Sequence, residues 1–201
     1  MTDKLKEFDL AVIGGGISGL SAALIMSAAI KDKKILSDKT VAVFDAGGSD
    51  ALKAKFFNAP GVKTGLSGKK AIKNLRKQVV DYGASKIYDK LVSHINKTED
   101  GFVITEKKGK KYKAQTLLLA TGFRKWRIEG IEIPLKRFTR TTNDSRVALE
   151  HNNYKVDDNI YVCGLLADVS SHYPIVAGTG AQAAINIIHD WTGEWIVVHD
   201  K

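Results

Sequence analysis

The segment that most constrains the fold is Asp9–Ala23, where an apolar run leads into a glycine turn and then into small residues. This order predicts a buried strand, a tight turn and an α-helix. Gly14 would let the chain turn sharply, Gly16 would leave space for phosphates beside the backbone, and Gly19 would let the helix pack on the strand. The free N–H groups and dipole of that helix favour an anion. We therefore expect a dinucleotide pyrophosphate here; a purely structural glycine turn is the alternative.

The size and apolar content predict one compact domain over residues 1–201. The chain has 201 residues, of which 44% are hydrophobic, so it can bury a substantial core. No apolar run reaches the roughly 18 residues that span a bilayer, and Met1–Glu7 lacks a signal-peptide pattern. We therefore expect a cytoplasmic protein with no membrane association, and the sequence suggests no metal site.

Cys163 is the one cysteine of the sequence, which excludes an internal disulfide and a CxxC redox pair. It lies in the apolar run Asn159–Gly164, where a buried structural thiol is the expected reading and a reactive thiol the alternative. Redox chemistry would then require a cofactor or the thiols of a partner.

The formal net charge of +9 is compatible with nucleic-acid binding, but the lysines are spread over turns and helix faces. The cluster Lys107–Lys111 is predicted to be a hairpin tip. No aromatic RNA-binding signature accompanies it, so we expect a solvated basic surface and no nucleic-acid partner.

Thr40–Asp45 reads as a second buried parallel strand that ends in an acid. A carboxylate at that position can accept hydrogen bonds from a ribose hydroxyl. Its distance from the glycine turn exceeds the usual ~20 residues because Lys31–Lys39 forms a polar extension. The alternative roles of Asp45 are a helix N-cap or a solvent-facing turn acid.

The remaining pattern predicts alternating helices and strands. We expect helices at Ser67–Tyr82, Asp144–Glu150 and Gly178–His189, strands at Ser85–Asn96, Phe102–Thr105, Tyr112–Lys113, Thr116–Gly122 and Asn159–Cys163, and a short strand or association surface at Glu194–Val198.

Four segments together resemble the FAD domain of thioredoxin reductase and related two-dinucleotide-binding flavoproteins. They are the glycine turn Gly14–Gly19, the stretch from Asn58-Ala-Pro-Gly61 through Ala84, the Ala120-Thr-Gly122 turn, and Ile160–Gly164 continuing to Ala184. The resemblance implies an α/β fold: a three-layer FAD/NAD(P)-binding Rossmann-like domain with a parallel sheet and a small antiparallel β-meander. Phe123–Asp158 would be a short crossover where relatives insert an NADPH domain.

The resemblance also implies the cofactor, FAD, and the residues that hold it. Asn58 would lie near the isoalloxazine ring, Asp168 would hydrogen-bond the ribityl chain or pyrophosphate, and His172–Val176 would run along the flavin. A loop acid capping the final helix is the alternative for Asp168, and a surface loop histidine is the alternative for His172. The complete set of expected cofactor-binding residues is Gly14, Gly16, Ile17, Ser18, Gly19, Asp45, Asn58, Val92, Thr121, Gly122, Gly164, Asp168, His172, Ile175 and Val176.

Three features depart from that family. The NADPH domain with its CxxC pair is missing, Leu165–Ala167 separates Gly164 from Asp168 where Gly-Asp is usual, and Asp45 replaces the commoner glutamate. We therefore expect a small FAD-dependent oxidoreductase that receives electrons from a partner protein or a diffusible donor, without an identified catalytic residue. A homodimer is expected because surface that the missing domain shields would be exposed. The alternatives are a non-catalytic FAD module, acting as a sensor or complex subunit, and an NAD(P)-binding protein of the same fold.

Overall fold

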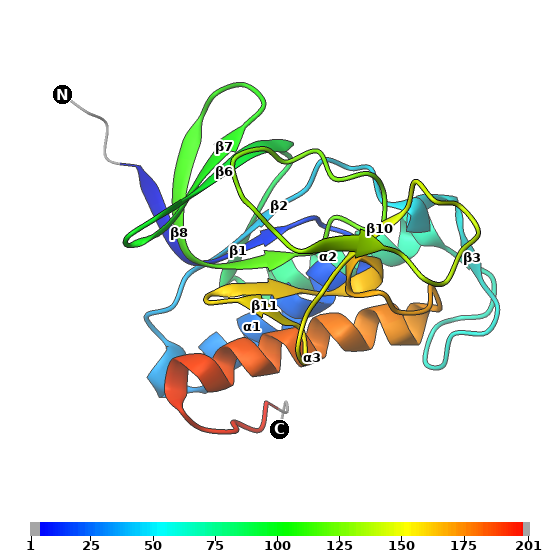
Figure 1. Ribbon diagram of the computed structural model, residues 1–201. Helices are drawn as coiled ribbons and strands as arrows, with labels where there is room; N and C mark the ends of the chain where they lie inside the picture. The colour runs from blue at the N-terminus through cyan, green and yellow to red at the C-terminus, as the bar shows by residue number, and fades with distance from the viewer. Residues whose placement is uncertain (1–4, 199–201) are drawn as a thin grey trace.

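The computed structural model describes residues 5–198, and within them an eight-stranded mixed sheet forms the centre of the molecule (Figure 1). Strand order along the sheet is β11-β12-β8-β1-β2-β5, with β6 and β7 continuing from β8. The parallel strands are β1 (Lys6–Ile13), β2 (Val41–Phe44), β5 (Ser85–Tyr88), β8 (Lys111–Leu119) and β12 (Ile160–Val162). The antiparallel additions are β6 (Val92–Thr98), β7 (Gly101–Glu106) and β11 (Lys155–Asp157).

Strand β1 lies in the middle of the parallel part, which explains its unbroken apolar sequence. It pairs with β2 through Leu10↔Val41 to Ile13↔Phe44 and with β8 as far as Ile13↔Leu119. Because both faces of a central parallel strand are covered, alternation of apolar and polar residues is not needed.

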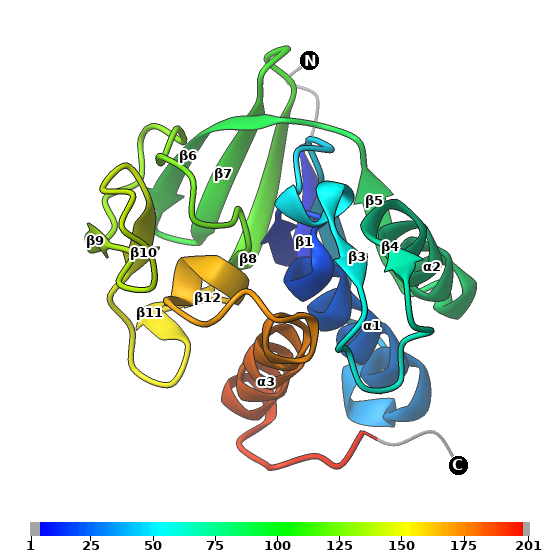
Figure 2. The same cartoon turned by 90° about the vertical axis from the view of Figure 1, so that its right-hand side faces the viewer.

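Three long helices cover one face of the sheet (Figure 2). Helix α1 lies between the other two and is buried on most of its surface, as its run of small and apolar residues requires. The helices are α1 (Ile17–Asp32), α2 (Gly68–Tyr82) and α3 (Tyr173–Thr192), and the short 3₁₀ helices are η1 (Lys34–Leu36), η2 (Asp50–Lys53) and η3 (Gly164–Ala167).

Helix α2 follows its sequence signals closely. Ser67 is the N-cap, its Oγ accepting from the backbone N–H of Lys70 at 3.3 Å, and Gly83 ends the helix with φ of +77°. Ala71, Ile72, Leu75 and Val79 form its buried face, while the lysines between them face solvent.

The β6-β7-β8 meander covers the other face, so the predicted three layers are confirmed. Alternate residues of β1 serve two cores: Leu10 and Val12 face the helices, while Ala11 and Ile13 face the meander side. Phe8, Phe44, Tyr88 and Tyr112 form an aromatic cluster in the second core. The turn between β7 and β8 contains Lys107–Lys110, as the predicted hairpin tip requires.

Several predicted elements differ from the structure in type or extent. Asp144–Glu150 is not a helix, because Val147–Leu149 is strand β10, paired antiparallel with β9 (Leu135–Arg137). Ala148 and Leu149 are fully buried there, so tertiary pairing overrides the helical propensity of the segment. Ser85–Asn96 is two strands, β5 and β6, that belong to different layers.

The final helix starts at Tyr173, before the predicted Gly178, and Glu194–Val198 forms no strand. Pro174 in the first turn suits a helix start because the missing N–H would have no intrahelical partner. A further short ladder joins β3 (Lys55–Phe56) to β4 (Leu66–Ser67) before α2.

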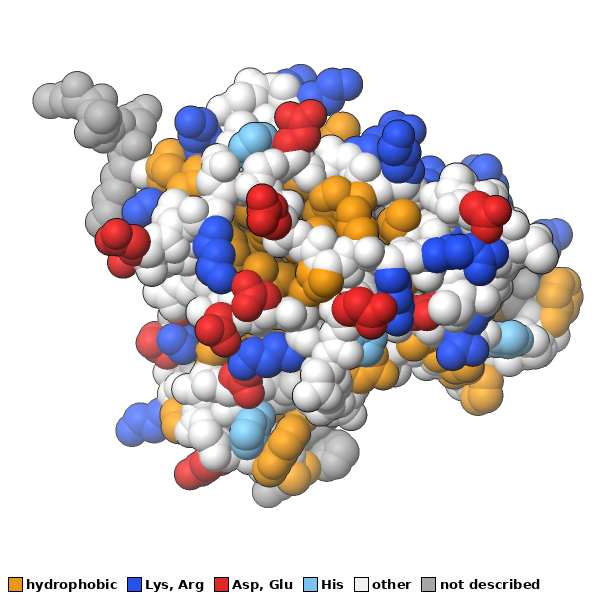
Figure 3. Space-filling model, in the orientation of Figure 1, with side chains coloured by type: hydrophobic (Ala, Val, Ile, Leu, Met, Phe, Trp, Pro, Cys, Tyr) orange, Lys and Arg blue, Asp and Glu red, His pale blue; other side chains and the backbone are white. Residues whose placement is uncertain are grey.

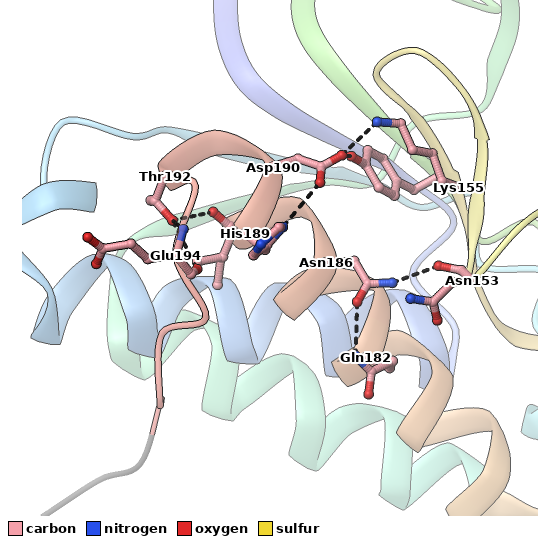
Figure 4. Close-up of polar contacts among 10 residues, drawn as sticks. Asn153, Lys155, Gln182, Asn186, His189, Asp190, Thr192 and Glu194 are labelled. Atoms are coloured by element: carbon pink, nitrogen blue, oxygen red, sulfur yellow. Dashed lines mark hydrogen bonds and ion pairs between the residues drawn. The ribbon is translucent and has the colours of Figure 1, made fainter.

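The end of α3 is fastened to the sheet by a polar network (Figure 4). The Asp190 carboxylate accepts hydrogen bonds from the Tyr161 hydroxyl and, at 2.7 Å, from the Lys155 ammonium. Asn186 donates to the carbonyl of Asn153 at 2.7 Å. These contacts bind α3 to β12 and to the β11 hairpin. None of the described helices is long and apolar enough to cross a membrane.

Candidate functional site

The strand order of the sheet reverses at β1, the strand that ends in the glycine turn. From β1 the chain builds outward to β2 and β5 on one side, and β8 and β12 lie on the other. Open parallel sheets bind ligands at the carboxyl ends of the strands where the order reverses. Figure 2 looks onto this end of the sheet, where β1 leads into α1 and where α3 begins.

The glycine turn has the backbone that the motif predicts. Gly14 has φ of +117°, and a Cβ on it would lie 2.3 Å from the Ala120 carbonyl oxygen. A Cβ on Gly19 would lie 2.0 Å from the Gly14 carbonyl oxygen, so glycine lets the helix lie against the strand end. Gly16 is the N-cap of α1 and supplies no side-chain cap, so the first N–H groups of α1 are left for water or a ligand.

Asp45 follows β2 directly and lies over the turn. It is 8% exposed, and its carboxylate accepts from the backbone N–H of Gly47 at 2.9 Å. A Cβ on Gly15 would lie 2.6 Å from the Asp45 side chain, so this glycine makes room for the acid. Arg76 of α2 donates to the same carboxylate at 2.8 Å and to Asp89 at 2.6 Å. Asp45 therefore bonds a turn and an arginine rather than capping a helix.

The first turn of α1 packs against the start of α3 and the end of β12. Ile17 and Ser18 are buried. A Cβ on Gly180 would lie 2.0 Å from the Ser18 carbonyl oxygen, and one on Gly164, whose φ is +67°, would lie 2.3 Å from Ser18 Oγ. The Ser18 side chain thus faces Gly164 and the Cys163 thiol, with which it hydrogen-bonds.

Cys163 is a buried thiol, in agreement with the structural reading. Its side chain is fully buried, and this burial raises its pKa to about 12. The hydrogen bond with Ser18 acts in the opposite direction and lowers the pKa by less. At neutral pH the group is a thiol rather than a thiolate and is a poor nucleophile.

Four further predicted residues differ in their burial or backbone conformation. Thr121 is exposed and Gly122 has φ of +75° in the turn after β8, beside the glycine turn. Asn58 is exposed in the loop between β3 and β4. Val92 is 5% exposed at the start of β6 and belongs to the core between meander and sheet.

Asp168 connects η3 to the crossover segment. It has φ of +55°, and its carboxylate accepts from the Thr139 backbone N–H at 2.9 Å and lies 3.6 Å from the Lys136 ammonium. Its own carbonyl accepts from Arg140 Nε at 2.8 Å. Asp168 does not cap α3, whose N-cap is His172.

The first turn of α3 is open to solvent. His172 is exposed, and its Nδ1 lies 2.8 Å from Ser170 Oγ. Ile175 is 43% exposed and Val176 is partly buried. The ring of Tyr173 packs edge to face against that of Phe56 in β3, with centroids 4.9 Å apart. Burial of the Tyr173 hydroxyl raises its pKa. No side chain caps this helix either.

Sequence reasoning missed Arg76, Gly15 and Thr139. Arg76 reads as one more basic residue of an amphipathic helix, and its relation to Asp45 exists only once α2 is packed. Gly15 carried a usable signal, since it completes three successive glycines. Among residues 5–198 no group of acidic, histidine or cysteine side chains is arranged to hold a metal ion.

Comparison with known proteins places these features in a family. The family model described as pyridine nucleotide-disulphide oxidoreductase matches residues 8–165. A thioredoxin reductase from Treponema pallidum is 34% identical over 116 residues, which are 58% of this chain and 36% of the relative. One from Borreliella burgdorferi is 26% identical over 127 residues, 62% of this chain and 36% of the relative. The chain thus spans about a third of the length of these curated relatives.

Solved structures share the fold. A putative thioredoxin reductase from Bacillus anthracis superposes with a TM-score of 0.70 at 17% identity, covering 94% of this chain and 100% of that one. A ferredoxin-flavin thioredoxin reductase from Clostridium acetobutylicum gives 0.67 at 15% identity, covering 94% and 99%. The three-layer α/β architecture is therefore that of thioredoxin reductases.

Proposed function

This chain belongs to the pyridine nucleotide-disulphide oxidoreductase family and is thioredoxin reductase-like, and from that premise we propose that it binds FAD and exchanges electrons with a partner protein or a diffusible donor. The main observation in favour of this proposal is the arrangement of residues at the carboxyl end of β1, where the strand order reverses. There, an uncapped helix begins at a glycine turn, and a carboxylate lies over the turn.

The residues at this end suit a dinucleotide. The backbone of Gly14–Gly16 carries no side chain that would block phosphates, and the N-terminus of α1 offers N–H donors and positive potential. Asp45 is placed to accept from a ribose hydroxyl, with Arg76 fixing its orientation. The start of α3, with His172, Ile175 and Val176, would lie along the flavin ring, which supplies the redox chemistry when bound.

The chain's own groups would hold and orient the cofactor rather than perform covalent chemistry. Cys163 is fully buried and its pKa is raised by burial, which argues against a disulfide step at this residue. The N–H groups at the start of α3 would stabilise negative charge near the ring. Electrons would then leave to an external acceptor.

The test is the reduction of the purified, FAD-loaded protein under anaerobic conditions. NADH, NADPH and a reduced protein carrier are added separately while the visible flavin absorption is followed. Bleaching by at least one donor supports the oxidoreductase. A yellow protein that only dithionite bleaches supports the second candidate, a non-catalytic FAD module. This candidate is favoured because Cys163, the one cysteine of the sequence, is fully buried.

We also propose a homodimer that uses the tail Trp191–Val198. Trp195 and Val197 are each 64% exposed, which is unusual for large apolar side chains. Gel filtration with light scattering tests this proposal, and a mass of one chain at micromolar concentration would contradict it.

A further inference from the structure

Positive charge is concentrated around the carboxyl end of the parallel strands. Residues 50–65 and 123–146 contain ten Lys and Arg but four Asp and Glu, which gives +6 of the whole chain's +9. Figure 3 shows Lys and Arg side chains gathered over the end of the molecule where Figure 1 draws β3, β10 and the start of α3. This end also holds the uncapped starts of α1 and α3, which add positive potential.

These segments are joined into one surface by direct contacts. Arg124 is paired with Asp50 of η2, with Nε at 3.3 Å, so the segment after β8 lies against the segment after β2. The rings of Phe123 and Phe138 are in contact, with their centroids 5.0 Å apart. Arg140 then reaches the Asp168 carbonyl at 2.8 Å, which links the crossover to η3.

The contact between the side chains of Phe56 and Tyr173 joins β3 to the start of α3. Phe57, the residue after Phe56, is 68% exposed, and Ile175, two residues after Tyr173, is 43% exposed. Large exposed apolar side chains on a charged surface are typical of protein interfaces rather than of a plain solvated surface.

The cations on this surface are available to a partner. Lys53, Lys55, Lys63 and Lys125, here called the basic rim, are exposed and have no ion-pair partner within residues 5–198. Two of the four acids in these segments are paired, Asp50 with Arg124 and Asp144 with Arg137 at 2.7 Å, while Glu129 and Glu132 are exposed. The uncompensated charge is therefore positive and faces solvent at the proposed flavin end.

We propose that the basic rim docks an acidic electron-carrier protein, which places its redox centre at the carboxyl end of the sheet. This inference rests on the proposed function, because the site would be of use only where a bound flavin exchanges electrons. Complementary charge would orient the carrier and raise its association rate, and the few exposed apolar side chains would suit a weak, short-lived complex. A single-stranded nucleic acid is the competing occupant of a basic surface, but the ring contacts at this end within residues 5–198, Phe56 with Tyr173 and Phe123 with Phe138, are edge-to-face pairs and not a row of stacked rings.

The experiment measures binding of an oxidised plant-type [2Fe–2S] ferredoxin, used as an acidic probe, by isothermal titration at low and high salt. The rim variant combines Lys53→Glu, Lys55→Glu and Lys125→Glu. The matched control combines Lys107→Glu, Lys108→Glu and Lys113→Glu, three exposed lysines at or next to the hairpin tip on the opposite end of β8. Far-ultraviolet circular dichroism and FAD content verify that both variants fold and load alike.

We expect binding to weaken roughly tenfold or more in the rim variant and with added salt, and to change about twofold or less in the control. A basic cytochrome c should show the opposite response to the rim variant. Equal weakening in rim and control variants, or tight binding of a single-stranded oligonucleotide without ferredoxin binding, would overturn the proposal. Because the titration is read without electron transfer, a protein that lacks FAD yet binds ferredoxin at the rim refutes the proposed function alone.

Discussion

Arg76 of α2 fixes the orientation of Asp45 after β2: its Nη1 donates to Asp45 Oδ2 across 2.8 Å, while Nη2 reaches Asp89 at 2.6 Å. The side chains of Arg76 and Asp45 are 28% and 10% exposed, so the pair is partly shielded from solvent. The geometry couples the helix that packs beside α1 to the carboxylate proposed to bind ribose.

Removal of Arg76 should therefore weaken FAD binding without unfolding the protein. For Arg76→Gln we expect the Kd for FAD to rise about tenfold, since an unoriented carboxylate binds a hydroxyl less well. Fluorescence titration of the apoprotein measures this. Lys73→Gln, an exposed neighbour on the same helix, is the control. Tighter FAD binding by Arg76→Gln would show that the arginine competes with the ribose instead.

Gly180→Ala should be strongly destabilising because its Cβ would lie 2.0 Å from the Ser18 carbonyl oxygen at the crossing of α1 and α3. Overpacking against backbone costs about 3 kcal/mol of unfolding free energy. Gly178→Ala is a matched control in the same helix, since nothing lies within 4 Å of its Cβ, and it should stabilise by up to about 1 kcal/mol. Urea unfolding measures both, and equal effects would refute the close crossing.

The buried thiol of Cys163 should make stability fall on the alkaline side. Burial raises its pKa from 9.0 to about 12, so between these values the unfolded chain loses this proton while the folded chain keeps it. The folded state then binds more protons, and the unfolding free energy decreases as pH rises through that window. Cys163→Ala should remove this part of the pH dependence in urea unfolding. An unchanged slope, or rapid labelling of the folded thiol at pH 8, would contradict the burial.

Asp190 should contribute to acid sensitivity. Burial raises its pKa, but the hydrogen bonds from Lys155 and Tyr161 outweigh burial, and the net pKa lies below 3.8. A lowered folded-state pKa gives stability that is present above the unfolded value and lost as pH falls through the folded one. Asp190→Asn should flatten thermal stability below about pH 4, while the exposed Asp38→Asn should not. Identical acid profiles for the two variants would rule out this role.

The sequence predicts the parts of the fold that depend on local pattern and misses those that depend on contact between distant segments. The strand and glycine turn at Gly14, and the acid at Asp45, follow from short apolar runs and turn chemistry. The strand at Val147–Leu149 could not be recognised, because its pairing with Leu135–Arg137 outweighs a helical local composition.

In the candidate site, too, the sequence predicts the local turn but not the contacts between distant segments. The sequence predicts the glycine turn correctly, but Ser18 faces Gly164 and the thiol of Cys163 because α3 crosses α1 there. The family resemblance predicts a role for Asp168, whereas its contacts with Thr139 and Lys136 depend on how the crossover folds back. Contacts between segments that are distant in the sequence leave no periodic pattern in it.

Binding of FAD by this chain is tested by the molar ratio of FAD to protein, measured by releasing the ligand from purified wild-type protein and from Gly16→Val after incubation with excess FAD. Gly16 lies at the start of α1, and a Cβ there would be 3.3 Å from Ser49 Oγ, so valine would occupy the space left for the phosphates. We expect a ratio of about one for wild type and far below one for a folded Gly16→Val. A wild-type protein that releases no FAD and binds none when it is supplied would contradict the account.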